Sequence, residues 1–272
     1  MNHTPLPRLI LLDGQSEYDV FHVWLQRLRD EFAEQGCTAE ILPVARESEL
    51  GTATDCITFG FNLIRKWRAE TAERMHWLWM VDPPPYHGQF FAPDLSGMPV
   101  KKKYCHVACV DADWVRMAKE IYGWNNVFFL PHAESVASAT PLNSKRRLYE
   151  TVFLGSYSHP DGILEDLKKR SGRHWQLVSQ VMEEWMAEPN EPLWKIIQRL
   201  GKRMGWTPGQ LKLFVNLYYV GLDRYGRNQS RRDWISSLDG RELHVFGAGY
   251  WRRAAWPKGI ILHDPVPFAK IP

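Results

Sequence analysis

Short apolar runs alternate with helical stretches along the first half of the chain. Residues 8–13 read as a buried strand that ends at Asp-Gly, and residues 39–43 read as a second one. Between them, apolar residues recur at the spacing of one helix face, namely Phe21, Trp24, Leu25, Leu28 and Phe32. Gly36 is well placed to end that helix. A strand, a helix and a second strand form a crossover unit, which favours a parallel sheet.

The same alternation continues to residue 130. The pattern predicts strands at 55–59, 76–81, 104–110 and 126–130, and helices at 62–74 and 111–122. Asp111 or Asp113 would cap the second helix. Residues 83–99 are rich in proline and glycine, and loops of that length in compact domains tend to be functional.

A second region begins at Glu150, after a polar stretch without a clear period. The pattern predicts strands at 151–154, 242–246 and 260–263, a helix at 161–170 and helices through most of 174–238. Breaks in the helical part are expected at Pro189, Pro192, Gly205 and Pro208. Mean sheets hold about 5–6 strands, so the three predicted strands favour a region that continues past Pro272.

The predicted fold is therefore α/β, with two Rossmann-like domains. Residues 1–133 form the first domain, 134–149 the linker, and 150–272 an incomplete second domain with a helical insertion at 174–238.

Composition narrows the function classes only a little. The net charge of +3 is too small to indicate nucleic-acid binding, and the clusters at 101–103 and 145–147 are best interpreted as solvated surface. No apolar run reaches the roughly 18–20 residues of a membrane span. Residues 1–7 do not form a secretory signal, so we expect a cytoplasmic protein.

The four cysteines are expected to be free thiols, as in a reducing compartment. Cys105-His106-x-x-Cys109 resembles half of a metal site, but it lies on a predicted strand and no second cysteine pair completes it. Buried packing is the better interpretation, so no metal is expected.

Candidate binding residues follow the predicted strands, because ligands of open α/β sheets bind at the carboxyl ends of the strands. Asp13, Gly14 and His132 occupy such positions in the first region. Asp82 and His87 follow another strand, where a carboxylate or an imidazole is able to accept a proton from a hydroxyl group. The alternative for each is an ordinary turn or loop residue.

Glycines follow two strands of the second region. Gly155 and Ser156 stand between a strand and a helix, a context that suits a diphosphate, although a tight turn with Ser156 near the helix cap explains the spacing slightly better. Gly247-Ala248-Gly249 resembles the start of a dinucleotide fingerprint, but Arg252 stands where its third glycine belongs. The hypothesis that the chain is a nicotinamide-dependent oxidoreductase would rest on this motif alone.

The strand ends taken in order resemble those of GT-B glycosyltransferases of the CgeB (spore maturation protein)-like group. The matching segments are Trp77–Pro84, Val110-Asp111, Asn126–Ala133, Val152–Ser156 and His244–Trp251. Each segment is short, and it is their order and spacing that carry the resemblance.

The resemblance implies two Rossmann-like domains that face each other across a cleft. The first would bind an acceptor at Asp13, Gly14 and His132, with Asp82 and His87 as catalytic candidates. The second would bind a nucleotide-sugar donor as co-substrate, with Gly155, Ser156, Gly247 and Gly249 near its phosphates, and no metal or other cofactor. Family members continue beyond the equivalent of Pro267-Phe268, where donor-binding residues lie.

Two functions from different classes follow. The first is a glycosyltransferase that acts on an unidentified acceptor. The second is a non-catalytic module that binds a glycan or a protein. The helical stretch at 174–238 and the absent part of the donor site motivate the second function, whereas the ordered strand-end segments favour the first, which is the preferred interpretation.

Overall fold

The computed structural model describes the chain in seven stretches, which are residues 8–14, 20–50, 55–62, 74–88, 104–132, 149–238 and 240–266. The described residues divide into two compact units, unit 1 from Arg8 to His132 and unit 2 from Tyr149 to Val266. Each unit contains its own parallel sheet. Most of the predicted helix at 62–74, of the loop at 83–99 and of the linker at 134–149 lies outside the described residues.

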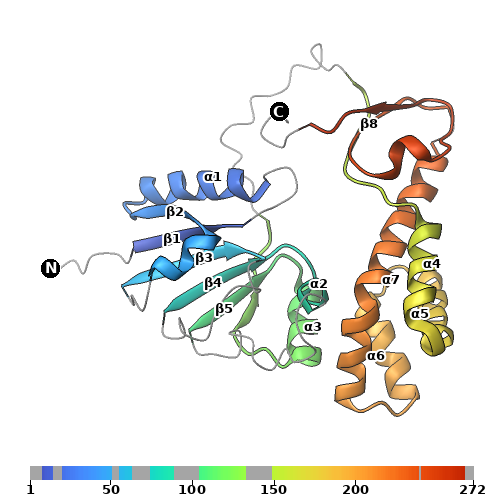
Figure 1. Ribbon diagram of the computed structural model, residues 1–272, viewed down its shortest axis with the longest axis horizontal. Helices are drawn as coiled ribbons and strands as arrows, with labels where there is room; N and C mark the ends of the chain where they lie inside the picture. Colours follow the sequence, from blue (N-terminus) through green and yellow to red (C-terminus); the bar gives the residue numbers. More distant parts are fainter. Residues whose placement is uncertain are drawn as a thin grey trace. The chain divides into compact units, whose positions relative to one another are not determined.

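Unit 1 is built on a six-stranded parallel sheet with the order β2-β1-β3-β4-β5-β6. Figure 1 shows the first five of these strands side by side in this order. The strands are β1 (Arg8–Asp13), β2 (Ala39–Pro43), β3 (Cys56–Phe61), β4 (Met75–Met80), β5 (Cys105–Cys109) and β6 (Val127–Phe129). All six were expected from short apolar runs, and the predicted parallel pairing is confirmed.

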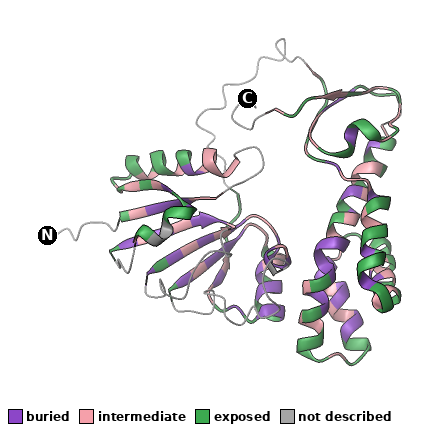
Figure 2. Ribbon diagram, in the orientation of Figure 1, coloured by how far each residue is buried: buried purple, intermediate pink, exposed green. Residues whose placement is uncertain are grey.

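Helix α1 (Val20–Glu34) packs on one face of this sheet. Leu11 of β1, Leu25 of α1 and Phe61 of β3 form the buried centre of that contact. Figure 2 shows α1 as mainly exposed and partly buried, in contrast to the buried positions along the strands. The apolar stripe of α1 therefore covers only a narrow strip, and the sheet supplies most of the core of unit 1.

Helix α3 (Ala112–Tyr122) follows β5 and packs against β5 and β6. Asp111 caps it by accepting a hydrogen bond from the Asp113 backbone N–H at 2.7 Å. The helix ends at Gly123, whose φ of +67° is the left-handed conformation that glycine adopts readily. The chain steps across the sheet in opposite directions through α1 and α3, so right-handed crossovers put the two helices on opposite faces.

Two short helices that the structure describes in unit 1 were not expected from the sequence. Helix α2 (Pro84–Gly88) begins where a loop was predicted, and the 3-10 helix η2 (Val44–Leu50) follows β2. The prolines explain α2, because the fixed φ of proline and its missing N–H suit the first turn of a helix. The loop prediction was therefore wrong for residues 84–88.

Unit 2 is mainly helical between its first and second strands. Its helices are α4 (Pro160–Ser171), the 3-10 helix η8 (Gly172–His174), α5 (Trp175–Ala187), α6 (Leu193–Arg203) and α7 (Pro208–Ser236). Figure 1 shows α7 running beside α4 and α6, and α7 contacts α4, α5 and α6. Pro189, Pro192, Gly205 and Pro208 stand at the predicted breaks.

Helix α7 begins with a capping box, in which Thr207 and Gln210 each bond the other's backbone N–H. Two glycines allow its neighbours to approach closely. A Cβ atom at Gly221 would overlap the Leu167 side chain, and one at Gly226 would overlap the Trp185 ring.

The sheet of unit 2 has three parallel strands among the described residues, in the order β7 (Val152–Leu154), β8 (Leu243–Phe246) and β9 (Ile260–His263). One face packs against the end of α7 and the 3-10 helix η9 (Tyr250–Arg253). The buried residues of that core are Tyr157, Ile235, Leu243, Val245 and Trp251.

The predicted α/β class is confirmed by the parallel sheets and their helices, and unit 1 is consistent with a Rossmann-like fold. The arrangement of two such domains as in GT-B enzymes remains a prediction. In the part of the chain that the structure describes, no helix combines the length and the apolar character needed to cross a membrane.

Candidate functional site

The strand order of unit 1 locates its best candidate site. After β1 the chain moves to β2 on one side and then returns to β3 on the other side of β1. The carboxyl ends of β1 and β3 therefore flank a topological switch point, where open α/β sheets bind their ligands. Asp13 is the last residue of β1, and Asn62 directly follows β3.

Asp13 is paired with a histidine that lies in the first turn of α1. His22 Nδ1 lies 2.6 Å from Asp13 Oδ2, and the two side chains are 43% and 24% exposed. Gln26, one turn further along α1, places its amide nitrogen 2.8 Å from His22 Nε2. Because an amide nitrogen is only a donor, Nε2 accepts and Nδ1 carries the proton that is donated to Asp13. Asp13 thus fixes the tautomer in which Nε2 carries a lone pair, and that lone pair accepts the hydrogen bond from Gln26.

Asn62 joins the ends of β3 and β4. Its backbone N–H donates to the Trp79 carbonyl at 3.1 Å, and its side chain accepts from the Val81 N–H at 3.0 Å. The side-chain amide then donates to Asp82 Oδ2 at 2.8 Å. Its φ of +51° is left-handed, a conformation that asparagine tolerates better than most residues. Asn62 therefore holds the Asp82 carboxylate in a defined orientation beside β3.

Aromatic rings surround these polar groups. The Phe61 ring stacks on Trp79 with centroids 5.5 Å apart, and Trp24 meets Phe61 edge-on at 5.3 Å. The His132 ring lies 5.2 Å from Trp24 and 5.8 Å from Trp79. The Trp79 indole donates to the Leu130 carbonyl at 3.1 Å, which ties the end of β6 to β4.

Burial against these rings lowers the pKa of His132 below the ordinary value of imidazole. The site thus combines partly buried aromatic surface with a few fixed polar groups, as small-molecule sites usually do.

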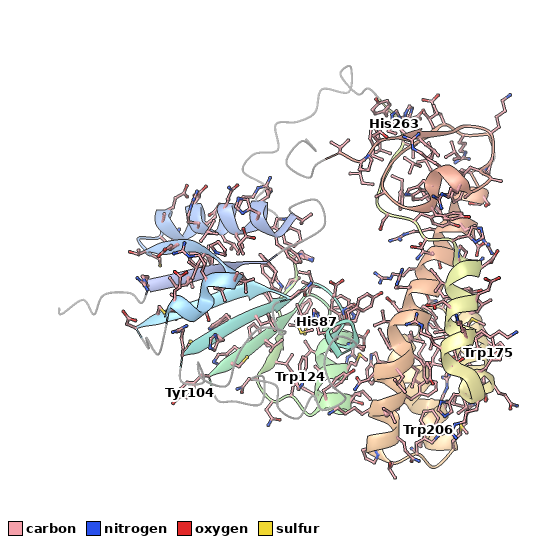
Figure 3. All side chains as sticks on the ribbon, in the orientation of Figure 1. His87, Tyr104, Trp124, Trp175, Trp206 and His263 are labelled. Carbon is pink, nitrogen blue, oxygen red and sulfur yellow. The ribbon has the colours of Figure 1, made fainter. Side chains whose placement is uncertain are left out.

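The other predicted residues of unit 1 are placed differently. Gly14 follows Asp13 and is partly exposed. His87 lies in α2 (Figure 3), which packs against α3, and only 8% of this residue is exposed. A histidine buried in this way is a poor partner for a hydroxyl group that arrives from solvent. Asp13, Asp82 and His132 stand at the ends of β1, β4 and β6, and His87 is set apart in its helix.

The glycines predicted in unit 2 come together, but they contact one another. The Gly155 N–H donates to the Phe246 carbonyl at 3.1 Å, and the Gly155 carbonyl accepts from the Trp251 indole at 2.8 Å. A Cβ atom at Gly247 would overlap the Gly155 carbonyl oxygen, and one at Gly249 would overlap that of Tyr157. These positions require glycine because two backbone segments pack without room for a side chain.

Two further backbone donors of the turn after β7 are also occupied. The Tyr157 N–H donates to the Ala248 carbonyl at 3.1 Å, and the Ser158 N–H donates to Asn228 Oδ1 at 2.8 Å. Ser156 is exposed, and its carbonyl accepts from Arg231 at 3.0 Å. A phosphate would therefore not find the amides of Gly155, Tyr157 and Ser158 available.

The segment after β8 also differs from a dinucleotide-binding motif. Gly249 is followed by the four-residue 3-10 helix η9, whereas the fingerprint opens a long helix whose N-terminus receives the pyrophosphate. Arg252, at the third glycine position, pairs with Asp264 at 2.6 Å.

Sequence reasoning missed His22 and Asn62. It considered histidines only in loops after strands, whereas His22 lies inside a helix, nine residues after Asp13. A search for histidines in the first turn of the helix that follows a strand would have found it. Asn62 directly follows β3, and its position after a glycine-containing strand was the available signal.

The cysteine-histidine motif of β5 does not form a metal site. Cys105 and Cys109 are buried on one face of the strand, whereas His106 on the other face packs 5.4 Å from the Trp77 ring. Burial raises the pKa of each thiol to about 12. Within the described stretches, no group of three or more His, Cys, Asp or Glu side chains is arranged to hold a metal ion.

Comparisons of the chain with protein-family models, with curated proteins and with solved structures gave no match.

Proposed function

We propose that this chain is a glycosyltransferase, or the greater part of one, and that the carboxyl edge of its six-stranded sheet binds the acceptor. The observation that carries the proposal is the Asp13–His22 pair at the switch point, with Nδ1 and Oδ2 2.6 Å apart. An imidazole oriented by a carboxylate is a standard general base for a hydroxyl group.

The chemistry assigned to the site is activation of an acceptor hydroxyl. His22 Nε2 takes the hydroxyl proton after Gln26 moves aside, and the oxygen attacks the anomeric carbon of a nucleotide sugar as the nucleoside diphosphate leaves. Trp24 and Trp79 offer partly buried ring surface to an acceptor, and Asp82 accepts hydrogen bonds from its hydroxyls. His22 thus replaces His87 as the preferred base.

The test uses the whole chain. Nucleotide sugars with uridine, guanosine, thymidine and cytidine carriers would be titrated by calorimetry, and release of nucleotide would be followed with pooled glycan acceptors. His22→Gln should lower transfer by about 10²–10⁴-fold, the usual contribution of a general base. Arg27→Gln, an exposed change on the same helix, should leave transfer unchanged. Failure of every nucleotide sugar to bind would reject the proposal.

One observation favours a non-catalytic binding module instead. The turn amides that would receive a donor diphosphate are bonded within unit 2, at Gly155, Tyr157 and Ser158. A binding module would retain glycans or a protein partner at the edge of the six-stranded sheet without any affinity for nucleotide sugars. Two measurements on the whole chain separate the two functions, namely binding to a glycan array and binding of nucleotide sugars by calorimetry. The module would bind glycans and no nucleotide sugar, whereas the enzyme would bind both.

A further inference from the structure

A chain of three ionisable side chains lies in unit 2, outside the site of unit 1. His244 of β8 places Nε2 2.7 Å from Glu242 Oε1 and Nδ1 2.7 Å from His263 Nε2. His263 is the last residue of the neighbouring strand β9 (Figure 3). Both nitrogens of His244 are therefore engaged, one by a carboxylate and one by a second imidazole.

The carboxylate fixes the direction of the hydrogen bonds when both imidazoles are neutral. Glu242 accepts, so the proton of His244 lies on Nε2, and His244 Nδ1 has a lone pair. His263 must then donate from Nε2, which leaves the lone pair of His263 on Nδ1. A carboxylate that orients one imidazole is a familiar arrangement in enzymes. Here the oriented imidazole in turn orients a second one.

The geometry favours a shared proton over a metal ion between the two rings. The rings are inclined by only 21° and their centroids are 5.0 Å apart, while the facing nitrogens are 2.7 Å apart. The two nitrogens thus face each other along the line between the rings, as in a linear hydrogen bond. Two imidazoles that chelate a metal would instead direct their lone pairs to a common point beside that line.

Aromatic rings hold the pair in place. The Tyr149 ring lies 4.0 Å from His244, and the Phe246 ring stacks on His263 at 4.2 Å with planes 7° apart. The His244 side chain is only 9% exposed, whereas that of Glu242 is 64% exposed. His263 is partly exposed at the carboxyl end of β9, the edge at which a parallel sheet presents groups to a ligand.

We infer that His263 Nδ1 is a proton acceptor for a hydroxyl-bearing ligand at the carboxyl edge of the three-stranded sheet. The ligand O–H proton passes to Nδ1, and the positive charge of the imidazolium is stabilised through His244 by the Glu242 carboxylate. No other atom is exchanged. This acid–base site is independent of the function proposed for unit 1.

The first test reads the tautomers directly. Nitrogen chemical shifts of the whole chain with labelled histidines, recorded at pH 8 to favour neutral imidazole, distinguish protonated from unprotonated ring nitrogens. The expected result is a proton on Nε2 of both His244 and His263. A proton on Nδ1 of His263 would overturn the inference.

The second test measures reactivity at the lone pair. Diethyl pyrocarbonate acylates unprotonated imidazole nitrogen, and mass spectrometry of peptides gives the rate at each histidine. Glu242→Gln should slow acylation of His263 by at least about tenfold, because the orienting carboxylate is lost. His22, in unit 1, serves as the internal reference.

His244→Phe keeps a ring beneath Tyr149 and removes both hydrogen bonds, so the tautomer of His263 is no longer fixed and its nitrogen chemical shifts should become those of a mixture of the two tautomers. An unchanged rate in a folded Glu242→Gln protein would contradict the inference, whatever His244→Phe does. Circular dichroism of each variant establishes that it is folded.

Discussion

The two sheets end in different ways at the edge where ligands are expected. In unit 1, side chains after β1, β3 and β4 bond one another and stay partly exposed, as Asp13 with His22 and Asn62 with Asp82 do. In unit 2, the turns after β7 and β8 close on themselves through backbone atoms, with Gly155 and Gly247 in contact. The same position in a fold thus offers side-chain chemistry in one unit and tight backbone packing in the other.

This difference shows that a glycine after a parallel strand has two opposite uses. It brings a backbone close to a phosphate, or it brings two protein segments close to each other. The two uses differ in whether the neighbouring N–H groups already donate hydrogen bonds within the protein. The N–H groups of Gly155, Tyr157 and Ser158 do so, which indicates packing between protein segments.

The largest expected effect tests the packing role of glycine in unit 2. Gly247→Ala places a methyl group in overlap with the Gly155 carbonyl oxygen and 2.7 Å from Trp251 Nε1, so the backbone at Gly155 must shift to admit it. We expect a loss of about 3 kcal/mol or more in the free energy of unfolding of unit 2, measured with urea.

The control for that change is a glycine without close neighbours. Gly162 lies in α4, and a Cβ atom there would meet nothing within 4 Å. Gly162→Ala should therefore stabilise unit 2 slightly, by about 0.5–1 kcal/mol, since alanine favours helix. If Gly247→Ala were as harmless as Gly162→Ala, the turn would be open and a phosphate site there would regain support.

The next effect tests the side-chain network of unit 1. Asn62→Ala removes the bonds to the Val81 N–H and to Asp82, each worth about 1 kcal/mol, and puts alanine in a left-handed conformation. We expect a loss of about 2 kcal/mol in the stability of unit 1. Asn62→Gly loses the same bonds without the conformational strain, so it should cost about 1 kcal/mol less. Equal losses in the two variants would show that φ at this position carries no strain.

The fold was more accessible from the sequence than the site. The short apolar runs and the turn residues between them predicted every strand that the structure describes in the two sheets. This is because buried parallel strands are short apolar runs bounded by turn residues. Helix α2 was missed, since prolines at a helix start resemble a loop. Asp13 and Asp82 were found because they end strands. Their partners His22 and Asn62 were not, because the pairing depends on which strands are neighbours in the sheet.

A smaller effect tests the hydrogen bond that closes the turn of unit 2. Trp251→Phe keeps an aromatic ring beside Tyr157 and removes the indole donor to the Gly155 carbonyl. Unit 2 should lose about 1–2 kcal/mol, because one hydrogen bond is lost and the smaller ring leaves space in the buried core. Trp234→Phe, at a ring that is 44% exposed, is the matched control and should change stability less. Equal effects would mean that the indole bond does not hold the turn.

The smallest expected effect is the pH dependence of stability that comes from His132 in unit 1. Burial against Trp24 and Trp79 lowers the pKa of His132, so the folded chain binds its proton less readily than the unfolded chain. The stability from this group is complete above the ordinary imidazole pKa of about 6.5 and is lost as the pH falls through the lowered value. His132→Gln should therefore flatten the decline in unit 1 stability below pH 6.5, measured by urea unfolding at a series of pH values. If stability declined equally in the variant, the decline would come from other titrating groups. Contact with the aromatic rings would then not affect the protonation of His132.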